Sequence, residues 1–377
     1  MRCGSAPCLK IFWDCRPEIR ERKEMMSLRH RKLKTGFILM GISAFALASC
    51  AGQKPASAAA PASPGLIVYT AQEKDVYEPI IKEFEERTNL TVRVETGSSE
   101  AMLRRLEEGR AETAGEKAPD WDVVFGIGAE VLEQGAEYWE PLQSAQADMI
   151  DKTFQLDGER ENKKWAAFSA RPLVIMYNTN VVTYRELPEG WNSLLEPRWR
   201  GRIAFGDPNR SDIYAEALAA AVEEAPEGLA EFMSNLEYKV LNDSSEVNEA
   251  IAEGRYSLGV TLEGSAQALL SAGAYIDYVY PREGTAVLLD GTAVAAGCAN
   301  PAAAREFVEF TLSRDVQRIL VSDLNRRSVR RDVPPRRGLS PIDRLPLVEV
   351  NFGELSERKQ NILKQWNAIM DREGGGT

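Results

Sequence analysis

Residues 66–89, LIVYTAQEKDVYEPIIKEFEERTN, contain the pattern that decides the fold. Leu66–Tyr69 is an apolar run that predicts a strand. The apolar residues that follow recur at helical spacing: Val76, Tyr77, Ile80, Ile81 and Phe84. The predicted helix ends near Asn89. A strand followed at once by an amphipathic helix is the unit from which α/β proteins are built.

This unit repeats along the chain. Strands are predicted at 91–95 and 122–125, and the helix between them begins at Gly97-Ser98-Ser99 and is closed by Gly109. A second series is predicted further on, with helices at 211–222, 229–236, 245–253 and 265–272 and strands at 203–205, 239–241, 256–262 and 275–280. Two α/β lobes are therefore predicted.

Two apolar segments, Pro172–Asn178 and Val287–Ala296, cross between the predicted lobes. They predict a two-stranded hinge, with lobe 1 at residues 65–171 plus 286–377 and lobe 2 at residues 172–285. Three further helices are expected in the C-terminal part, over 301–312, 314–321 and 356–370.

Charge and composition exclude several classes of function. The chain has 377 residues, 46 Lys+Arg and 57 Asp+Glu, and residues 1–50 hold 10 of the former and 4 of the latter, so residues 51–377 carry 36 against 53, a balance of -17. Such acidity disfavours nucleic acid as a partner. The single histidine, His30, lies in the first 50 residues, which excludes a Ser-His-Asp triad or a His-ligated zinc site from the rest. No cofactor and no resident metal are expected.

The N-terminal region predicts export. A basic stretch precedes the apolar run Gly36–Leu47, as in a secretory signal peptide at residues 1–49. Residues 1–24 resemble no part of a signal, and Met25 and Met26 stand just before the basic stretch, which indicates a start of translation downstream of Met1. Leu47-Ala48-Ser49-Cys50 resembles the lipobox of bacterial lipoproteins, which implies lipidation of Cys50.

The resemblance to lipoproteins places the protein in the periplasm or on the cell surface, anchored by lipid to a bacterial membrane. Residues 50–64 are rich in Ala, Pro and Ser and predict a flexible linker. Cys298 is then the remaining cysteine of the folded part, and we expect a buried structural thiol.

The turns that follow strands predict a binding cleft, because open parallel sheets bind ligands at the carboxyl ends of their strands. Glycines there let the backbone approach a ligand, and Ser, Thr and Asn can donate hydrogen bonds to a phosphate or carboxylate. The candidates are Thr70, Gln72, Glu73, Ser98, Ser99, Gly126, Gly128, Asp207, Asn209, Arg210, Ser211, Glu263, Gly264 and Ser265. Ser98, Ser99 and Ser211 have an alternative role as helix N-caps.

Several stretches carry a family resemblance in their order along the chain. Besides residues 66–89 they are WDVVFGIGAEVLEQ (121–134), ARPLVIMYNTNVV (170–182), WNSLLEPRWRGRIAFGDPNRSD (191–212), GRYSLGVTLEGSAQALLSAGA (254–274), YPREGTAVLLDGTAVAAGCANPAAAREFVEFTLS (280–313) and RILVSD (318–323). They resemble the type-II periplasmic solute-binding proteins of ABC importers, in the cluster with ferric-ion, phosphonate and hexose-phosphate binding proteins.

The resemblance spans about residues 66–366 and implies a type II periplasmic-binding-protein-like fold. It also implies a monomeric receptor that closes on its solute by hinge motion and delivers it to an ABC permease with its ATPase. In the ferric branch a His, a Glu and a consecutive Tyr pair hold the iron. At the matching positions this chain has Glu73, a residue around Ile127, and Gly264-Ser265.

The departures from the ferric branch favour a small anionic solute, such as a phosphorylated sugar or a phosphonate. Arg171, beside the hinge, is a candidate for an ion pair with that solute, or for a structural salt bridge. Asp290 and the candidate carboxylates can accept hydrogen bonds from hydroxyls or an ammonium. Ferric-ion binding is the alternative within the family, and a sensor or a carboxylate-pair hydrolase is the alternative from another class. The basic segment 326–337 is expected to be a solvated loop, with docking on the permease or on anionic lipid as the other option.

Overall fold

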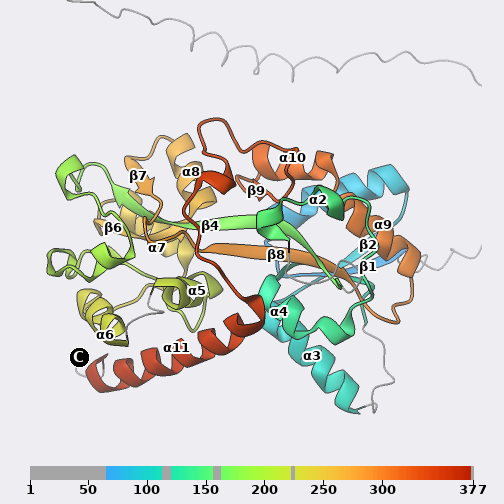
Figure 1. Ribbon diagram of the computed structural model, residues 1–377, viewed down its shortest axis with the longest axis horizontal. Coiled ribbons are helices and arrows are strands. Elements are labelled where there is room, and N and C mark those ends of the chain that lie inside the picture. Colours follow the sequence, from blue (N-terminus) through green and yellow to red (C-terminus); the bar gives the residue numbers. More distant parts are fainter. Residues whose placement is uncertain (1–64, 113–119, 156–162, 222–225, 375–377) are drawn as a thin grey trace, which may run out of the picture. The chain divides into compact units, whose positions relative to one another are not determined.

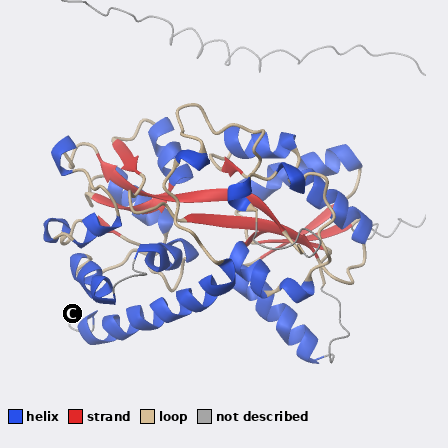
Figure 2. Ribbon diagram, in the orientation of Figure 1, coloured by secondary structure: helices blue, strands red, loops and turns tan. Residues whose placement is uncertain are grey.

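The computed structural model describes residues 65–112, 120–155, 163–221 and 226–374 (Figures 1 and 2). The predicted signal peptide, Cys50 and the linker that follows it lie outside these ranges. Within the described ranges, no helix has the length and apolar character needed to cross a membrane.

Lobe 1 begins with three parallel strands. β1 (Leu66–Thr70) pairs with β2 (Val92–Thr96) on one side and with β3 (Val123–Gly128) on the other. α2 (Lys74–Thr88) buries the predicted apolar stripe, and Asn89 ends it in the left-handed conformation at φ 57°. α3 (Ser99–Glu112) continues past Gly109, so the prediction that this glycine closes the helix is wrong. α4 (Ala129–Gln134) follows β3 directly.

Two long strands connect the lobes. β4 (Ala166–Asn178) is buried along its whole length except at Arg171. It pairs antiparallel with β8 (Val287–Val294), which also pairs antiparallel with β3. Because the sheet order is β2-β1-β3-β8-β4-β6-β5, these two strands join the sheet of lobe 1 to that of lobe 2. Figure 1 shows them side by side through the middle of the folded part, and the predicted two-stranded hinge is confirmed.

Lobe 2 is built on β5 (Ile203–Ala204), β6 (Leu258–Leu262) and β7 (Ile276–Val279). β6 is parallel to β5 and antiparallel to β4. Four helices cover this sheet: α5 (Asp212–Ala221), α6 (Pro226–Asn235), α7 (Ser244–Ala252) and α8 (Glu263–Ser271). The strand predicted at 239–241 is reduced to an isolated bridge between Leu241 and Gly206.

The chain then returns to lobe 1 and crosses back. α9 (Pro301–Thr311), α10 (Arg314–Ser322) and β9 (Arg327–Ser328) lie in lobe 1, where β9 pairs with β4. The long helix α11 (Phe352–Glu373) packs against α4 of lobe 1 and α5 of lobe 2. Short 3-10 helices lie in the connections: η1 (Ala136–Tyr138), η2 (Ala147–Met149), η3 (Lys152–Phe154), η5 (Tyr184–Glu186), η6 (Trp191–Leu195), η7 (Pro197–Trp199) and η8 (Ile342–Arg344).

Two separate hydrophobic cores lie on the two sides of the hinge. In the first, Phe125 contacts Phe168 and Phe307 edge to face, and Cys298 is a free, buried thiol as predicted. The second contains Phe205 and Trp366. Trp366 belongs to α11, so this part of the C-terminal helix packs with lobe 2, and the prediction that all of residues 286–377 belong to lobe 1 is corrected there.

Candidate functional site

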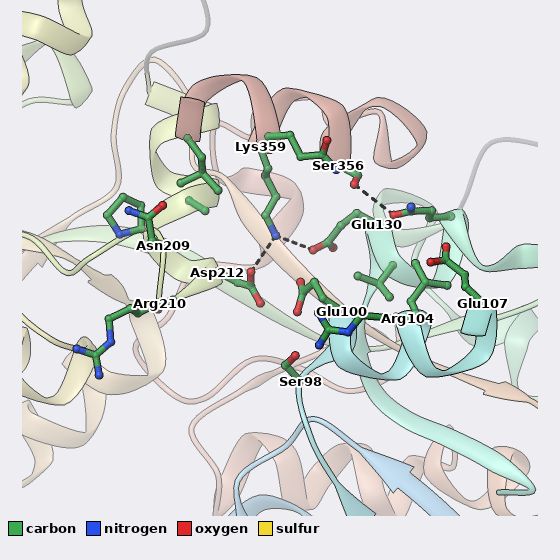
Figure 3. Close-up of a pocket in the computed structure, with 18 residues that line it drawn as sticks. Ser98, Glu100, Arg104, Glu107, Glu130, Asn209, Arg210, Asp212, Ser356 and Lys359 are labelled. Carbon is green, nitrogen blue, oxygen red and sulfur yellow. Dashed lines mark hydrogen bonds and ion pairs between the residues drawn. The ribbon is translucent and has the colours of Figure 1, made fainter. Parts of the chain in front are cut away.

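A cavity of about 510 Å³ lies between helices of the two lobes (Figure 3). Its walls come from α3 and α4 of lobe 1, from the start of α5 and the turn before it in lobe 2, and from α11. This volume is in the range of small-molecule sites. Four of the residues predicted for the ligand line it: Ser98, Asn209, Arg210 and Ser211.

The wall from lobe 1 is organised by two serines. Ser98 Oγ accepts a hydrogen bond from the amide of Ala101 at 3.1 Å, as an N-cap of α3. Ser99 is buried, and its Oγ accepts a hydrogen bond from the amide of Gly128 at 3.1 Å. Ser98 thus both caps a helix and lines the cavity, whereas Ser99 ties the start of α3 to the end of β3.

The wall from lobe 2 is the turn that precedes α5. Asp207 Oδ1 accepts a hydrogen bond from the amide of Asn209 at 2.9 Å, which is an Asx turn and directs Asp207 into its own loop. Arg210 is exposed and donates to Asn242 Oδ1 at 3.0 Å. Ser211, the residue before α5, stands beside it in the cavity wall. The predicted anion-binding turn therefore contributes Arg210 and Ser211 to the cavity wall, with the Arg210 guanidinium held by Asn242, while Asp207 stabilises the turn.

Lys359 on α11 is the best-connected charge of the cavity. Its ammonium lies 3.0 Å from Glu130 Oε1 in lobe 1 and 3.1 Å from Asp212 Oδ1 in lobe 2, and Glu216 Oε1 is 4.0 Å away. Figure 3 shows the side chain extending from α11 to the carboxylates of Glu130 and Asp212. Lys359 and Glu130 are both buried, so their contact is shielded from solvent, whereas the side chain of Asp212 is exposed. One lysine thereby links both lobes.

Burial and neighbouring charges shift the pKa values of this cluster. Burial alone would lower the pKa of Lys359, but the carboxylates of Glu130, Asp212 and Glu216 outweigh it and raise that pKa. Burial raises the pKa of Glu216 well above its ordinary value, and Glu130 adds to the effect. Lys359 therefore stays charged, and Glu216 holds its proton at a higher pH than an exposed glutamate does.

The turn after β1 is a packed structural unit. Thr70 Oγ1 donates to the carbonyl of Phe125 at 2.7 Å and accepts from the amide of Gln72. Gln72 Nε2 donates to the carbonyl of Gly126 at 2.6 Å, and Gly126 has φ +65°. A Cβ on Gly126 would meet Gln72 at 2.3 Å. Glu73 is exposed and precedes α2.

The turn after β6 is covered by residues that follow α10. Glu263 is buried and pairs with Arg327 of β9, with Oε2 and Nη2 2.8 Å apart, and it also accepts from Tyr280 at 2.6 Å. A Cβ on Gly264 would lie 2.4 Å from the carbonyl oxygen of Asn325. Ser265, the next residue, is half-buried. The side chain of Glu263 is therefore committed to an ion pair.

The hinge holds a second charged cluster. Asp290 on β8 is buried and lies 2.6 Å from Arg171 Nη2 and 2.9 Å from Arg326 Nη1. Ser169 Oγ donates to the same carboxylate at 2.7 Å. Asp290 also sits opposite Gly128 in the pairing of β3 and β8. Arg171 therefore forms a structural salt bridge with Asp290, which is one of the two roles predicted for it.

The basic segment 326–337 is not the solvated loop that was expected. Arg326 is mostly buried, Arg327 is buried and pairs with Glu263, and Arg330 is buried. Arg330 pairs with Asp332 at 2.8 Å. The sequence does not reveal that Arg326 and Arg327 face buried carboxylates, because Asp290 and Glu263 lie far away along the chain.

Several lining residues of the cavity escaped the sequence analysis. Glu100 and Glu130 lie in the first turns of α3 and α4, one or two residues beyond the predicted turns, and a wider window would have included them. Lys359 and Arg104 gave no signal, because helical spacing does not reveal which face of a helix meets a cavity. Within the described ranges, no group of three or more His, Cys, Asp or Glu side chains is placed to hold a metal ion.

The family model for bacterial extracellular solute-binding proteins matches residues 120–343. The chain belongs to this family. The resemblance to type-II periplasmic solute-binding proteins of ABC importers is thereby confirmed. The major ferric iron-binding protein of Neisseria meningitidis serogroup B is 24% identical over 323 residues, which cover 80% of this chain and 92% of that protein.

Solved structures show the same fold. The periplasmic binding protein AfuA from Actinobacillus pleuropneumoniae, with fructose-6-phosphate bound, has a TM-score of 0.69 at 20% identity over 81% of this chain and 98% of its own. Iron-bound HitA from Pseudomonas aeruginosa gives a TM-score of 0.69 at 20% identity over 81% and 98%. The type II fold predicted from the resemblance is confirmed. The solutes of these relatives differ, so the residues of the site must decide between them.

Proposed function

We propose that this protein is the lipid-anchored receptor of an ABC importer that captures a small anionic solute, a phosphorylated sugar or a phosphonate, between its lobes. The two lobes close on the solute, and the closed form delivers it to the permease and its ATPase. Binding without chemical change is the whole task. The anchor is the lipid on Cys50, which holds the receptor at the membrane.

The observation that carries this proposal is the composition of the cavity walls. Ser98 from lobe 1 and Arg210 and Ser211 from lobe 2 face the same cavity. Hydroxyls and a guanidinium are donors that suit phosphate oxygens. Glu100 and Asp212 line the cavity too, and carboxylates accept hydrogen bonds from sugar hydroxyls or an ammonium. A solute with one anionic group and several donors fits this mixed wall.

Ferric ion is the second candidate, because the curated relative named above is a ferric iron-binding protein. Two contacts count against it. Glu263 already pairs with Arg327, and Gly264 stands where the family has the first tyrosine of its pair. A side chain at Gly264 would collide with the carbonyl of Asn325. Ferric ion needs several anionic oxygen ligands. In the turn after β6, the carboxylate of Glu263 is already paired and Gly264 supplies no phenolate, so this turn offers fewer ligands than the ferric branch has there.

Native mass spectrometry of the full chain, expressed in a bacterial periplasm and purified without chelator, tests the proposal. A co-purified phosphate ester or phosphonate is the expected result. Titrations with fructose 6-phosphate and with fructose as the matched neutral control then measure how much the anionic group contributes. Iron retained with a small anion, or equal binding of both sugars, would contradict the proposal.

A further inference from the structure

The charged cluster at the hinge is unusual because two arginines share one carboxylate. Asp290 Oδ1 is taken by Arg171 and Oδ2 by Arg326 and Ser169. Arg326 Nη1 also approaches Ser169 Oγ at 3.3 Å. The pair of guanidinium groups carries two positive charges against the single negative charge of Asp290. The contacts therefore leave the cluster one positive charge in excess.

Donors remain after these contacts are made. Each guanidinium has five N–H groups, and the bonds to Asp290 and Ser169 use few of them. Arg171 Nε is shielded from solvent and donates to no acceptor in the described part of the chain. A buried donor without an acceptor costs free energy, so an oxyanion that reaches it gains that bond and removes the cost.

The surrounding carboxylates compensate Arg326 less than they compensate Arg171. Glu130 is matched by Lys359, and burial raises the pKa of Glu216, which favours its neutral form. The negative charge of Asp75, in the first turn of α2, raises the pKa of Arg326. Burial, with the positive charge of Arg171 adding to it, nevertheless lowers the pKa of Arg326 to about 10, because Asp290 and Asp75 compensate too little. Arg326 is a cation with an incomplete set of counter-charges.

The cluster lies next to elements that line the cavity, although Arg171, Arg326 and Asp290 are not themselves lining residues. Asp290 is the neighbour of Gly128 at the carboxyl end of β3, and Gly128 is bonded to Ser99 at the start of α3. Burial would lower the pKa of Arg171, but the carboxylates of Asp290, Glu216 and Glu130 outweigh it and raise that pKa, and Glu130 lines the cavity. The side chains of Arg171 and Arg326 keep 21% and 13% of their surface accessible, so solvent reaches both.

We propose that Arg171 and Arg326 form the subsite for the anionic group of the solute, and that Asp290 is the counter-ion that positions both guanidinium groups. Two planar forks on one anion suit a phosphate or phosphonate dianion, which has three oxygens to share, better than a carboxylate, which has two. This inference rests on the proposed function and names the residues that give it its preference for dianions. Arg326 is a specificity-determining residue that the sequence placed in a solvated loop.

Isothermal titration of the full chain in detergent with inorganic phosphate tests the inference. R326Q and R171Q should each weaken phosphate binding by about tenfold or more, as expected for loss of a charge-assisted hydrogen bond. R305Q is the matched control, because Arg305 pairs with Glu140 on lobe 1 at 2.6 Å and should leave the affinity unchanged. R326K keeps the charge without the fork and should fall between wild type and R326Q.

D290N provides an independent readout if an arginine variant fails to fold. Without phosphate its melting temperature should fall, because two buried cations lose their counter-ion. Added phosphate should then raise the melting temperature by more than in wild type. A smaller rise would overturn the inference.

The failures of the two proposals are separable. If wild type binds phosphate and both R326Q and R171Q bind it within twofold of wild type, the subsite is wrong and the proposed function stands. If wild type binds neither phosphate nor fructose 6-phosphate, both are wrong.

Discussion

Gly264 has no room for a side chain. It lies in the first turn of α8, and a Cβ there would meet the carbonyl oxygen of Asn325 at 2.4 Å. That carbonyl is backbone, which cannot move aside without shifting β9. The close approach lets Arg327 reach Glu263, so one glycine allows a buried ion pair between lobe 1 and lobe 2.

G264A should therefore destabilise the protein by about 1–3 kcal/mol, the range for an added group in a packed site. G109A is the matched control, since Gly109 also lies inside a helix but an added Cβ has nothing within 4 Å. Alanine there should stabilise α3 by about 0.5–1 kcal/mol. Urea unfolding of both variants measures the difference, and equal effects would show that Asn325 can move away at little cost.

At the scale of single residues, the sequence identified several residues of the cavity and the hinge but not the partners that they contact. Ser98, Arg210 and Ser211 were found because Gly, Ser and Arg follow predicted strands, and these residues do line one cavity. Arg171 was correctly placed beside the hinge, with its partner undecided. Asp290 was also named, but nothing local reveals that it meets Arg326 in space.

α11 connects the two lobes as a single rigid element. Ser356 Oγ lies 3.3 Å from Gln134 of α4, while Asn367 exchanges two amide hydrogen bonds of 3.0 Å with Asn209 before α5. Between these ends Lys359 bonds to both lobes. The sequence predicted the helix from its apolar spacing, but its placement depends on contacts with residues about 150 or more positions away, which a local pattern does not contain.

K359M should cost about 3–5 kcal/mol of stability, because it leaves the buried carboxylate of Glu130 without its cation. Methionine retains most of the side-chain volume, so the loss measures charge rather than packing. K74M is the matched control: Lys74 pairs with Glu78 at 3.3 Å on the exposed face of α2 and contributes about 0–1 kcal/mol. Similar losses in the two variants, measured by denaturant unfolding, would contradict a central role for Lys359.

The stability of the protein should depend on pH through Glu216. Because burial, with Glu130 second, raises its folded pKa well above the ordinary 4.5, the folded state binds a proton that the unfolded state has released. Stability contributed by this group is complete below the unfolded pKa and decreases as pH rises from about 4.5 through the raised folded value. E216Q is neutral at every pH, so it should remove this decrease.

Wild type should therefore become less stable relative to E216Q as the pH rises above the ordinary carboxyl pKa of 4.5. The other charges facing Glu216 are Lys359, Arg171 and Asp212, and both proteins share them. Unfolding free energies at a series of pH values give the measurement. A constant difference between the proteins would show that Glu216 is ionised throughout.

At the scale of the whole molecule, the alternation of strands and helices predicted two lobes. The two apolar segments 172–178 and 287–296 predicted the two-stranded hinge. The sequence did not predict how firmly the lobes are joined. The joint consists of β4 and β8, the ion pair of Glu263 with Arg327, and α11 with Lys359. Each pairs residues from distant parts of the chain, so no local sequence pattern reveals it.

The two cores should respond unequally when this joint is weakened. Trp366 on α11 is fully buried in the second core beside Phe205, whereas Phe352, at the start of α11, is only partly buried against Trp165 of the first core. Loosening α11 by K359M should therefore lower the opening free energy of β6 in lobe 2 more than that of β3 in lobe 1. Hydrogen exchange at increasing denaturant, followed in peptides from these strands, measures both energies in each protein. In wild type we expect the two strands to open together. If K359M lowers both energies equally, α11 stabilises the molecule as one cooperative unit, and the lobes do not depend on it separately.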